Sequence, residues 1–249
     1  MARSHDVPPS DGGRATVPLP RGSLPASDIG SVVGRVDAAS PFVEIATTGG
    51  SATTWLSDVA AHVAVGADPL RPWRVALREQ QQGTDAVTVP AHVPAAFVLQ
   101  WWCEVVATPI AYAAELGPWV LAPEPAGLGF ELAPALYPSR IVVLPERTRL
   151  WVEPHAGTRA VAARASYDAL VADVVAGYAP EVRMGSRQRW GVVDDMWRAA
   201  VRRGAGAAGR VVGTEPVRTS CCFIFVLPGM HECASCPRGG PPLGTGRQA

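Results

Sequence analysis

The residues from Val93 to Leu116 read VPAAFVLQWWCEVVATPIAYAAEL, an apolar stretch in the middle of a chain of 249 residues. A stretch of this length can cross a membrane as a helix, but Gln100, Glu104 and Pro109 interrupt it. A glutamate near the centre of a membrane helix costs about 2–3 kcal/mol on insertion scales. We therefore predict a buried core helix of a globular protein, kinked or ended near Pro109.

Apolar residues spaced three and four apart predict further helices on both sides of this stretch. The first helix lies within residues 29–46, where Ile29, Val32, Val33 and Val36 share one face. The others are predicted at residues 54–65, at residues 73–82 up to Gly83, at residues 160–178 and at residues 188–203. Helices are thus expected to form most of the fold.

Short strands are predicted between the helices. SPFVEIAT, residues 40–47, alternates apolar and polar side chains, while SRIVVLPE and TRLWVEP, residues 139–146 and 148–154, are rich in β-branched residues. We predict that the last two form a hairpin with its turn at PERT, and that residues 117–138 form a loop. The absence of regular βαβ alternation argues against a doubly wound sheet. The predicted fold class is α+β, a mostly helical body with a small antiparallel sheet and a C-terminal cysteine-rich segment.

Composition along the chain predicts its division into segments. Residues 1–26 are rich in Pro, Gly and Ser without an apolar core, so we expect a disordered tail and no secretory signal. The remaining segments are a body at residues 27–203, a glycine-rich link at residues 204–217, the cysteine segment at residues 218–238 and a flexible tail at residues 239–249.

Charge and motifs exclude several classes of function. The 22 basic residues balance 22 acidic ones, whereas a general nucleic-acid-binding protein carries a basic excess. GAGAAG, residues 204–209, fits a dinucleotide fingerprint but opens no helix of useful length, so we interpret it as a linker. Asp194 and Asp195 are adjacent and are predicted on a solvated helix face. No zinc-type histidine pair, nucleophile elbow or P-loop occurs, so no catalytic residue is identified.

Four of the five cysteines lie within RTSCCFIFVLPGMHECASCPR, residues 218–238, and these are Cys221, Cys222, Cys233 and Cys236. Four thiolates suit either a tetrahedral zinc ion or the two irons of a [2Fe–2S] cluster. Adjacent side chains diverge on an extended backbone, so the Cys–Cys pair reaches two irons more readily than one ion. Between the pairs, FIFVLPGMHE is predicted to run as a strand into a turn that returns the chain to Cys233. Cys103 lies among apolar residues and is expected to pack in the core.

The cysteine segment resembles the C-terminal signature of the ferric siderophore reductases of the FhuF type. That signature is C-C-x10-C-x2-C, commonly with Arg and Ser before the first pair and Pro after the last Cys. Here Arg218 and Ser220 precede the first pair, and Pro237 follows Cys236. The resemblance covers about twenty residues at the end of the chain, as in the family.

The resemblance implies an enzyme in which Cys221, Cys222, Cys233 and Cys236 bind a [2Fe–2S] cluster. It implies one-electron transfer to ferric siderophores of the hydroxamate type, with release of Fe²⁺ in the cytoplasm. An external electron donor such as a ferredoxin or a flavin reductase is then required, and no nucleic acid is expected as a partner. We expect no transmembrane span, although peripheral association with a membrane stays open. Two alternatives remain at this point, a zinc-stapled binding module and a [2Fe–2S] electron carrier that serves a protein partner.

Overall fold

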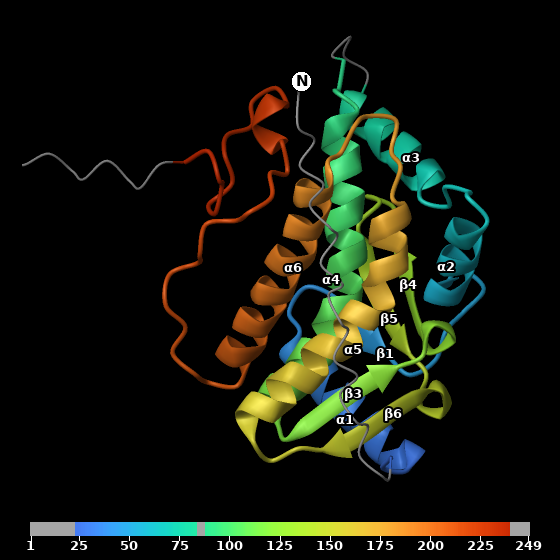
Figure 1. The fold of residues 1–249 in the computed structure, drawn as a ribbon, viewed down its shortest axis with the longest axis vertical. Coiled ribbons are helices and arrows are strands. Elements are labelled where there is room, and N and C mark those ends of the chain that lie inside the picture. The colour runs from blue at the N-terminus through green and yellow to red at the C-terminus, as the bar shows by residue number, and fades with distance from the viewer. Residues whose placement is uncertain (1–22, 84–87, 240–249) are drawn as a thin grey trace, which may run out of the picture.

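The structure is a computed structural model, and it describes residues 23–83 and 88–239. These residues form six α-helices and six strands, which confirms the predicted α+β class (Figure 1). The helices are α1 (Ala26–Ala39), α2 (Leu56–Ala64), α3 (Arg71–Gln82), α4 (His92–Leu116), α5 (Ala156–Gly177) and α6 (Ser186–Ala207). The strands are β1 (Glu44–Ala46), β2 (Thr54–Trp55), β3 (Trp119–Pro123), β4 (Leu128–Leu132), β5 (Pro138–Val143) and β6 (Thr148–Val152).

Helix α4 lies at the centre of the molecule, as the apolar stretch predicts. It packs against α1, α3, α5, α6 and strand β3. Its length and hydropathy are those of a membrane span, yet 83% of its most apolar window is buried within the protein. The helix continues through Pro109, so of the two predicted outcomes, a kink or an end, the end is wrong. Proline leaves the carbonyl of Val105 without its helical donor, and packing on all sides keeps the helix together.

The other helices follow the predicted periodicity with shifted ends. The four apolar residues chosen for the first helix are all buried in α1. Helix α3 ends at Gly83, whose φ of +58° lies in the region that favours glycine. Helix α2 begins only at Leu56, because Thr54 and Trp55 pair with β4 as a short strand.

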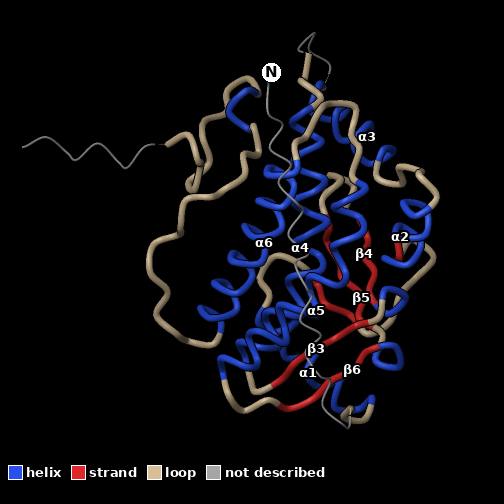
Figure 2. The backbone as a smooth tube through the Cα atoms, in the orientation of Figure 1, coloured by secondary structure: helices blue, strands red, loops and turns tan. Residues whose placement is uncertain are grey.

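The main sheet has four strands in the order β1-β5-β4-β2, and β3 and β6 form a separate antiparallel pair. Strand β1 runs parallel to β5, with Ile45 opposite Ile141, whereas the other neighbours are antiparallel. The sheet is therefore mixed, and the prediction of a purely antiparallel sheet is wrong in this respect. Figure 2 shows β4 and β5 between α2 on one side and α4, α5 and α6 on the other.

Residues 119–152 form one long hairpin with a corner in it. Strand β4 pairs with β5, and β3 pairs with β6, so the predicted hairpin between β5 and β6 is wrong. The predicted loop at residues 117–138 is also wrong, since it contains β3 and β4. Two 3₁₀ turns make the corner and bond to each other, with Glu124 N donating to Arg147 O (2.9 Å) and Leu144 N to Gly127 O (2.8 Å). A Cβ on Gly127 would lie 2.5 Å from Arg147 O, so this close approach requires glycine.

The predicted segment boundaries shift at both ends of the body. Of the predicted disordered tail at residues 1–26, residues 1–22 lie outside the described residues. Its last residues are ordered, since Leu24 N donates to Leu150 O at 2.7 Å. Helix α6 runs on through Ala207, so the predicted link begins later, and Gly204 packs against Tyr112 and Glu115 of α4. Most of the predicted C-terminal tail, residues 240–249, lies outside the described residues.

Candidate metal centre

After α6 the chain reverses and runs back along that helix to the cysteines (Figure 1). We call residues 208–217 the return segment and residues 218–238 the cysteine segment. Val212 lies beside Gly206, and Arg202 donates to the carbonyl of Gly213. Farther along, Cys221 lies beside Gln188 in the first turn of α6. The cysteine segment therefore begins at the N-terminal end of α6.

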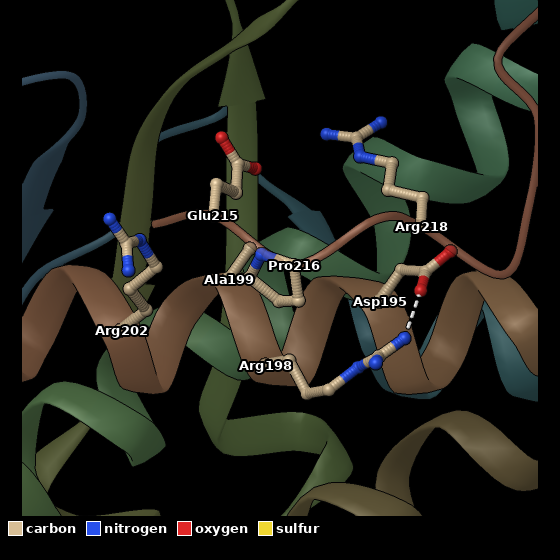
Figure 3. Close-up of a pocket in the computed structure, with 7 residues that line it drawn as sticks. All are labelled: Asp195, Arg198, Ala199, Arg202, Glu215, Pro216 and Arg218. Carbon is tan, nitrogen blue, oxygen red and sulfur yellow. Dashed lines mark hydrogen bonds and ion pairs between the residues drawn. The ribbon is translucent and has the colours of Figure 1, made fainter. Parts of the chain in front are cut away.

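Asp195 of α6 holds the start of the cysteine segment. Its carboxylate accepts hydrogen bonds from the amides of Thr219 (2.9 Å) and Ser220 (2.7 Å) and from the Ser220 hydroxyl (2.5 Å). It also pairs with Arg198, as the dashed line in Figure 3 shows. The Asp195 side chain is 1% exposed, so these bonds compensate the burial of its charge. The prediction that Asp195 lies on a solvated helix face is wrong, whereas Asp194 is exposed and pairs with Arg164.

Two glutamines fasten the same segment on either side of Asp195. The side-chain amide of Gln188 donates to the carbonyl of Cys221 at 2.8 Å, and its oxygen lies 3.5 Å from the Cys221 amide. On α4, the oxygen of Gln100 accepts from the Arg218 guanidinium at 3.3 Å. The first cysteine pair is thus tied directly to α6, and the start of its segment is tied to α4 through Arg218. Neither glutamine stands out in the sequence, because the partners are more than thirty residues away.

The four cysteines of the segment are free thiols. Cys222 and Cys236 are buried, whereas Cys221 and Cys233 are partly exposed, so each pair contributes one sulfur to the protein side and one toward solvent. The Sγ atoms of Cys222 and Cys233 lie 3.8 Å apart, which brings the two halves of the motif together. Burial is the main reason that the pKa of Cys233 is raised to about 11, and the neighbouring Cys222 thiol is the second reason. Burial also raises the pKa of Cys221, against the Phe223 amide that donates to its sulfur.

The chain between the two pairs turns sharply after Cys222. Phe223 has a φ of +60°, a left-handed conformation that is costly for a bulky side chain. Its ring packs edge-on against His92 at the start of α4, with 4.6 Å between centroids. Residues 224–226 form a single 3₁₀ turn, so the strand predicted in this stretch is wrong. Arg238 lies over the ring of Phe225 at 4.3 Å and closes the segment on itself.

The donor set fits an iron–sulfur group. Thiolates are soft ligands that select zinc, copper(I) or iron–sulfur clusters, and the raised thiol pKa values mean that a metal charge is needed to hold these sulfurs as thiolates. Within residues 23–83 and 88–239, no three His, Cys, Asp or Glu side chains are grouped to hold one metal ion. The observed close contact joins one sulfur from each half of the motif, those of Cys222 and Cys233. The assignment of all four cysteines as ligands stays a prediction.

Cys103 is fully buried in α4, as predicted, and burial raises its pKa to about 12. His231 is exposed near Cys233, and His62 is exposed on α2. Arg189 donates to three carbonyls at the end of α5. Among the tryptophans, Trp102, Trp151 and Trp197 are buried, Trp101 is partly buried and Trp190 is exposed.

A pocket of about 370 Å³ lies between α4 and the edge of the sheet. Trp101, Tyr137 and Phe42 give it an aromatic wall, and Glu104 and Thr108 supply polar groups. None of the residues that line this pocket belongs to the cysteine segment.

Comparison with known families assigns the cysteine segment. Residues 218–238 match the family model described as the FhuF 2Fe-2S C-terminal domain, and all four cysteines lie within the match. No curated protein matches the chain. The segment is therefore an iron–sulfur domain of the FhuF type, and its cofactor is a [2Fe–2S] cluster.

Proposed function

We propose that the protein is a ferric-siderophore reductase that delivers single electrons to Fe³⁺ in a hydroxamate-type chelate. The observation that carries the proposal is the FhuF-type cysteine segment, with one sulfur from each half of its motif in contact and with Cys221 beside the first turn of α6. In proteins with cysteine ligands a [2Fe–2S] cluster supplies one electron per cycle, at about −400 mV in plant-type ferredoxins. Each cycle would convert one Fe³⁺ to Fe²⁺, and an external donor would replace the electron.

The chemistry of the substrate explains why the site needs no acid–base residue. Fe³⁺ is a hard ion held by oxygen donors, and Fe²⁺ is held less tightly, so reduction alone loosens the chelate. For a one-electron step each 59 mV of unfavourable potential difference costs about tenfold in the equilibrium constant. Capture of Fe²⁺ by other ligands would draw the reaction forward. We assign the reaction to the cytoplasm, where thiols stay reduced.

The protein's own residues would orient and shield the sulfurs. Asp195, Gln188 and Gln100 fix the first cysteine pair, and burial of Cys222 and Cys236 excludes water from one side. Cys221 and Cys233 face solvent in part. A bulky chelate could therefore approach this edge directly, without entering a deep pocket.

The test is reoxidation of the reduced protein by ferric chelates. The protein would be purified without oxygen, reduced with half a mole of dithionite per mole of cluster, which supplies one electron, and mixed with ferrioxamine, ferrichrome or ferric citrate in the presence of a ferrous chelator. We expect the visible spectrum to return to the oxidised form with one Fe²⁺ trapped per chain. The gallium complexes of the same siderophores are the control, because Ga³⁺ cannot accept the electron. Failure of every ferric chelate to reoxidise the protein would contradict the proposal.

A further inference from the structure

We propose that the groove between α6 and the return segment docks an acidic electron-carrier protein. This inference rests on the proposed function, since a reductase that passes one electron to Fe³⁺ must be supplied with another. The groove has a volume of about 320 Å³. Trp197 and Val201 of α6 line it on one side, and Val212 and Pro216 of the return segment line it on the other.

Two arginines stand at the rim of this groove. Arg198 and Arg202 line both the groove and the small neighbouring pocket that Figure 3 shows. On the other side of this pocket lie Glu215 of the return segment and Arg218, the first residue of the cysteine segment. Arg198 shares its charge with Asp195, but its side chain is 44% exposed and Asp195 is buried beneath it. Arg202 donates to a carbonyl and has no carboxylate partner within the part of the chain that the structure describes.

The wider surroundings are basic as well. Residues 186–239 contain eight arginines and four carboxylates, and Glu104 and Glu115 of α4 pair with two of these arginines, which leaves an excess of two positive charges in a chain whose net charge is zero. One of the four carboxylates, Asp195, is buried and does not face a partner. A surface of this sign attracts an acidic protein and repels a basic one, and the attraction accelerates association.

The shape favours a protein over a small chelate. The pocket enclosed by the arginines themselves has room for about 20 Å³, close to a single water, whereas small-molecule sites have several hundred Å³ and enclose their ligands. The larger groove is open, and exposed apolar side chains continue beyond it, with Val211 fully exposed and Val217 59% exposed. An apolar centre with a charged rim is the usual anatomy of a protein–protein interface.

The position suits electron delivery. The return segment leads directly into the cysteine segment, and Val217 is four residues from Cys221. On α6, Arg198 and Arg202 are ten and fourteen residues from Gln188, which contacts Cys221, so the rim lies about 15 to 21 Å along the helix from the first cysteine pair. A carrier bound in the groove would cover the chain that holds this pair.

Binding can be measured without any ferric substrate. The cluster-loaded protein would be titrated by calorimetry with oxidised plant-type ferredoxin, an acidic carrier, and with cytochrome c, a basic one. We expect binding to ferredoxin alone, weakened about tenfold between 50 and 500 mM salt because screening acts on exposed charges. Arg202→Glu should weaken it about tenfold at low salt, and Val212→Ser about threefold. Arg149→Glu on β6 is the matched control, since Arg149 is exposed away from the groove, and it should change binding less than twofold.

The visible spectrum and melting temperature of each variant would show that the fold and cluster are intact. Equal binding by Arg202→Glu and the native protein would overturn the inference, as would equal affinity for both carriers or self-association through the same arginines. The ferric-chelate assay uses dithionite instead of a carrier. If the carrier does not bind, the proposed reductase activity can therefore still be tested and supported. If no ferric chelate is reduced, the binding measurement still tests the docking surface.

Discussion

At the scale of single residues, Asp195 is the side chain on which the cysteine segment depends most. Replacement by Asn removes the charge. It also places an NH₂ group, which donates hydrogen bonds, where the carboxylate accepts them from the Thr219 and Ser220 amides and the Ser220 hydroxyl. We expect Asp195→Asn to lower the free energy of unfolding by about 2–3 kcal/mol, because hydrogen bonds to a buried charge are lost. Iron and acid-labile sulfide per chain should fall with it, measured on anaerobic preparations beside thermal unfolding.

The neighbouring residue supplies the control. Asp194→Asn changes the same charge on an exposed side chain and should cost less than about 1 kcal/mol with full iron content. Similar losses in both variants would show that the charge of α6, and not the bonds of Asp195, holds the segment.

The thiols themselves give a second prediction at this scale. Cys222→Ser replaces a buried sulfur that contacts Cys233, and we expect the protein to retain less than about a tenth of its iron and sulfide. Cys103→Ala removes a buried thiol of the core and should leave iron and sulfide unchanged, at a cost of about 1–2 kcal/mol in stability. Two irons and two sulfides retained in Cys222→Ser would refute the ligand assignment.

The sequence predicts the thiols but not the residues that place them. The spacing of the cysteines is visible because the ligands are neighbours in the chain. The sequence predicts a solvated Asp195 because adjacent aspartates on a helix do not face each other. That geometry is correct for the pair, but it does not reveal which chain segment packs over Asp195. Its partners lie 24 and 25 residues later, in a stretch without regular secondary structure, so no periodicity could reveal the contact.

At the scale of elements, the bent hairpin shows where local patterns fail. The strands at β5 and β6 were both predicted, and PERT between them resembles a hairpin turn. The structure uses Pro145–Arg147 as a 3₁₀ corner instead, and each strand pairs with a partner from residues predicted as a loop. Prolines and glycines in residues 117–138 suggested irregular chain. Pro125 and Gly127 form the corner, and Pro123 and Pro138 stand at the ends of β3 and β5, where the ladder tolerates proline. Gly129 lies inside β4 and pairs with strands on both sides.

This corner makes a prediction about stability. Gly127→Ala places a Cβ 2.5 Å from the carbonyl oxygen of Arg147, and the two 3₁₀ turns must separate to admit it. We expect a loss of about 1–3 kcal/mol in the free energy of unfolding, measured by urea titration with circular dichroism. Gly34→Ala in α1 is the matched control, because nothing lies within 4 Å of its Cβ, and it should stabilise by about 0.5–1 kcal/mol. A neutral Gly127→Ala would mean that the corner is looser than its hydrogen bonds indicate.

At the scale of the whole molecule, the protein consists of a body with its own hydrophobic core and of the cysteine segment, which is attached to the surface of that body. The hydrophobic core is continuous from α1 through α4 to α6, and the buried cysteines of the cysteine segment are not part of it. The core could be anticipated from the sequence, since the apolar stretch at residues 93–116 and the periodic helices supply most of it. How the final segment joins this body could not, because the connection consists of polar contacts to Asp195, Gln188 and Gln100.

This division predicts how the protein responds to loss of its metal. Removal of iron by a chelator under reducing conditions should leave the body folded, because the core contacts do not pass through the thiols. Hydrogen exchange should then accelerate at least tenfold in residues 223–238, where few backbone hydrogen bonds protect the chain, while α4 amides keep their protection. The amides of Thr219 and Ser220 should lie between these limits, since Asp195 still accepts from them. The cluster-loaded protein is the reference, and Asp195→Asn should move these two amides to the fast class. Accelerated exchange throughout α4 after iron removal would show instead that the cluster and the core fold as one unit.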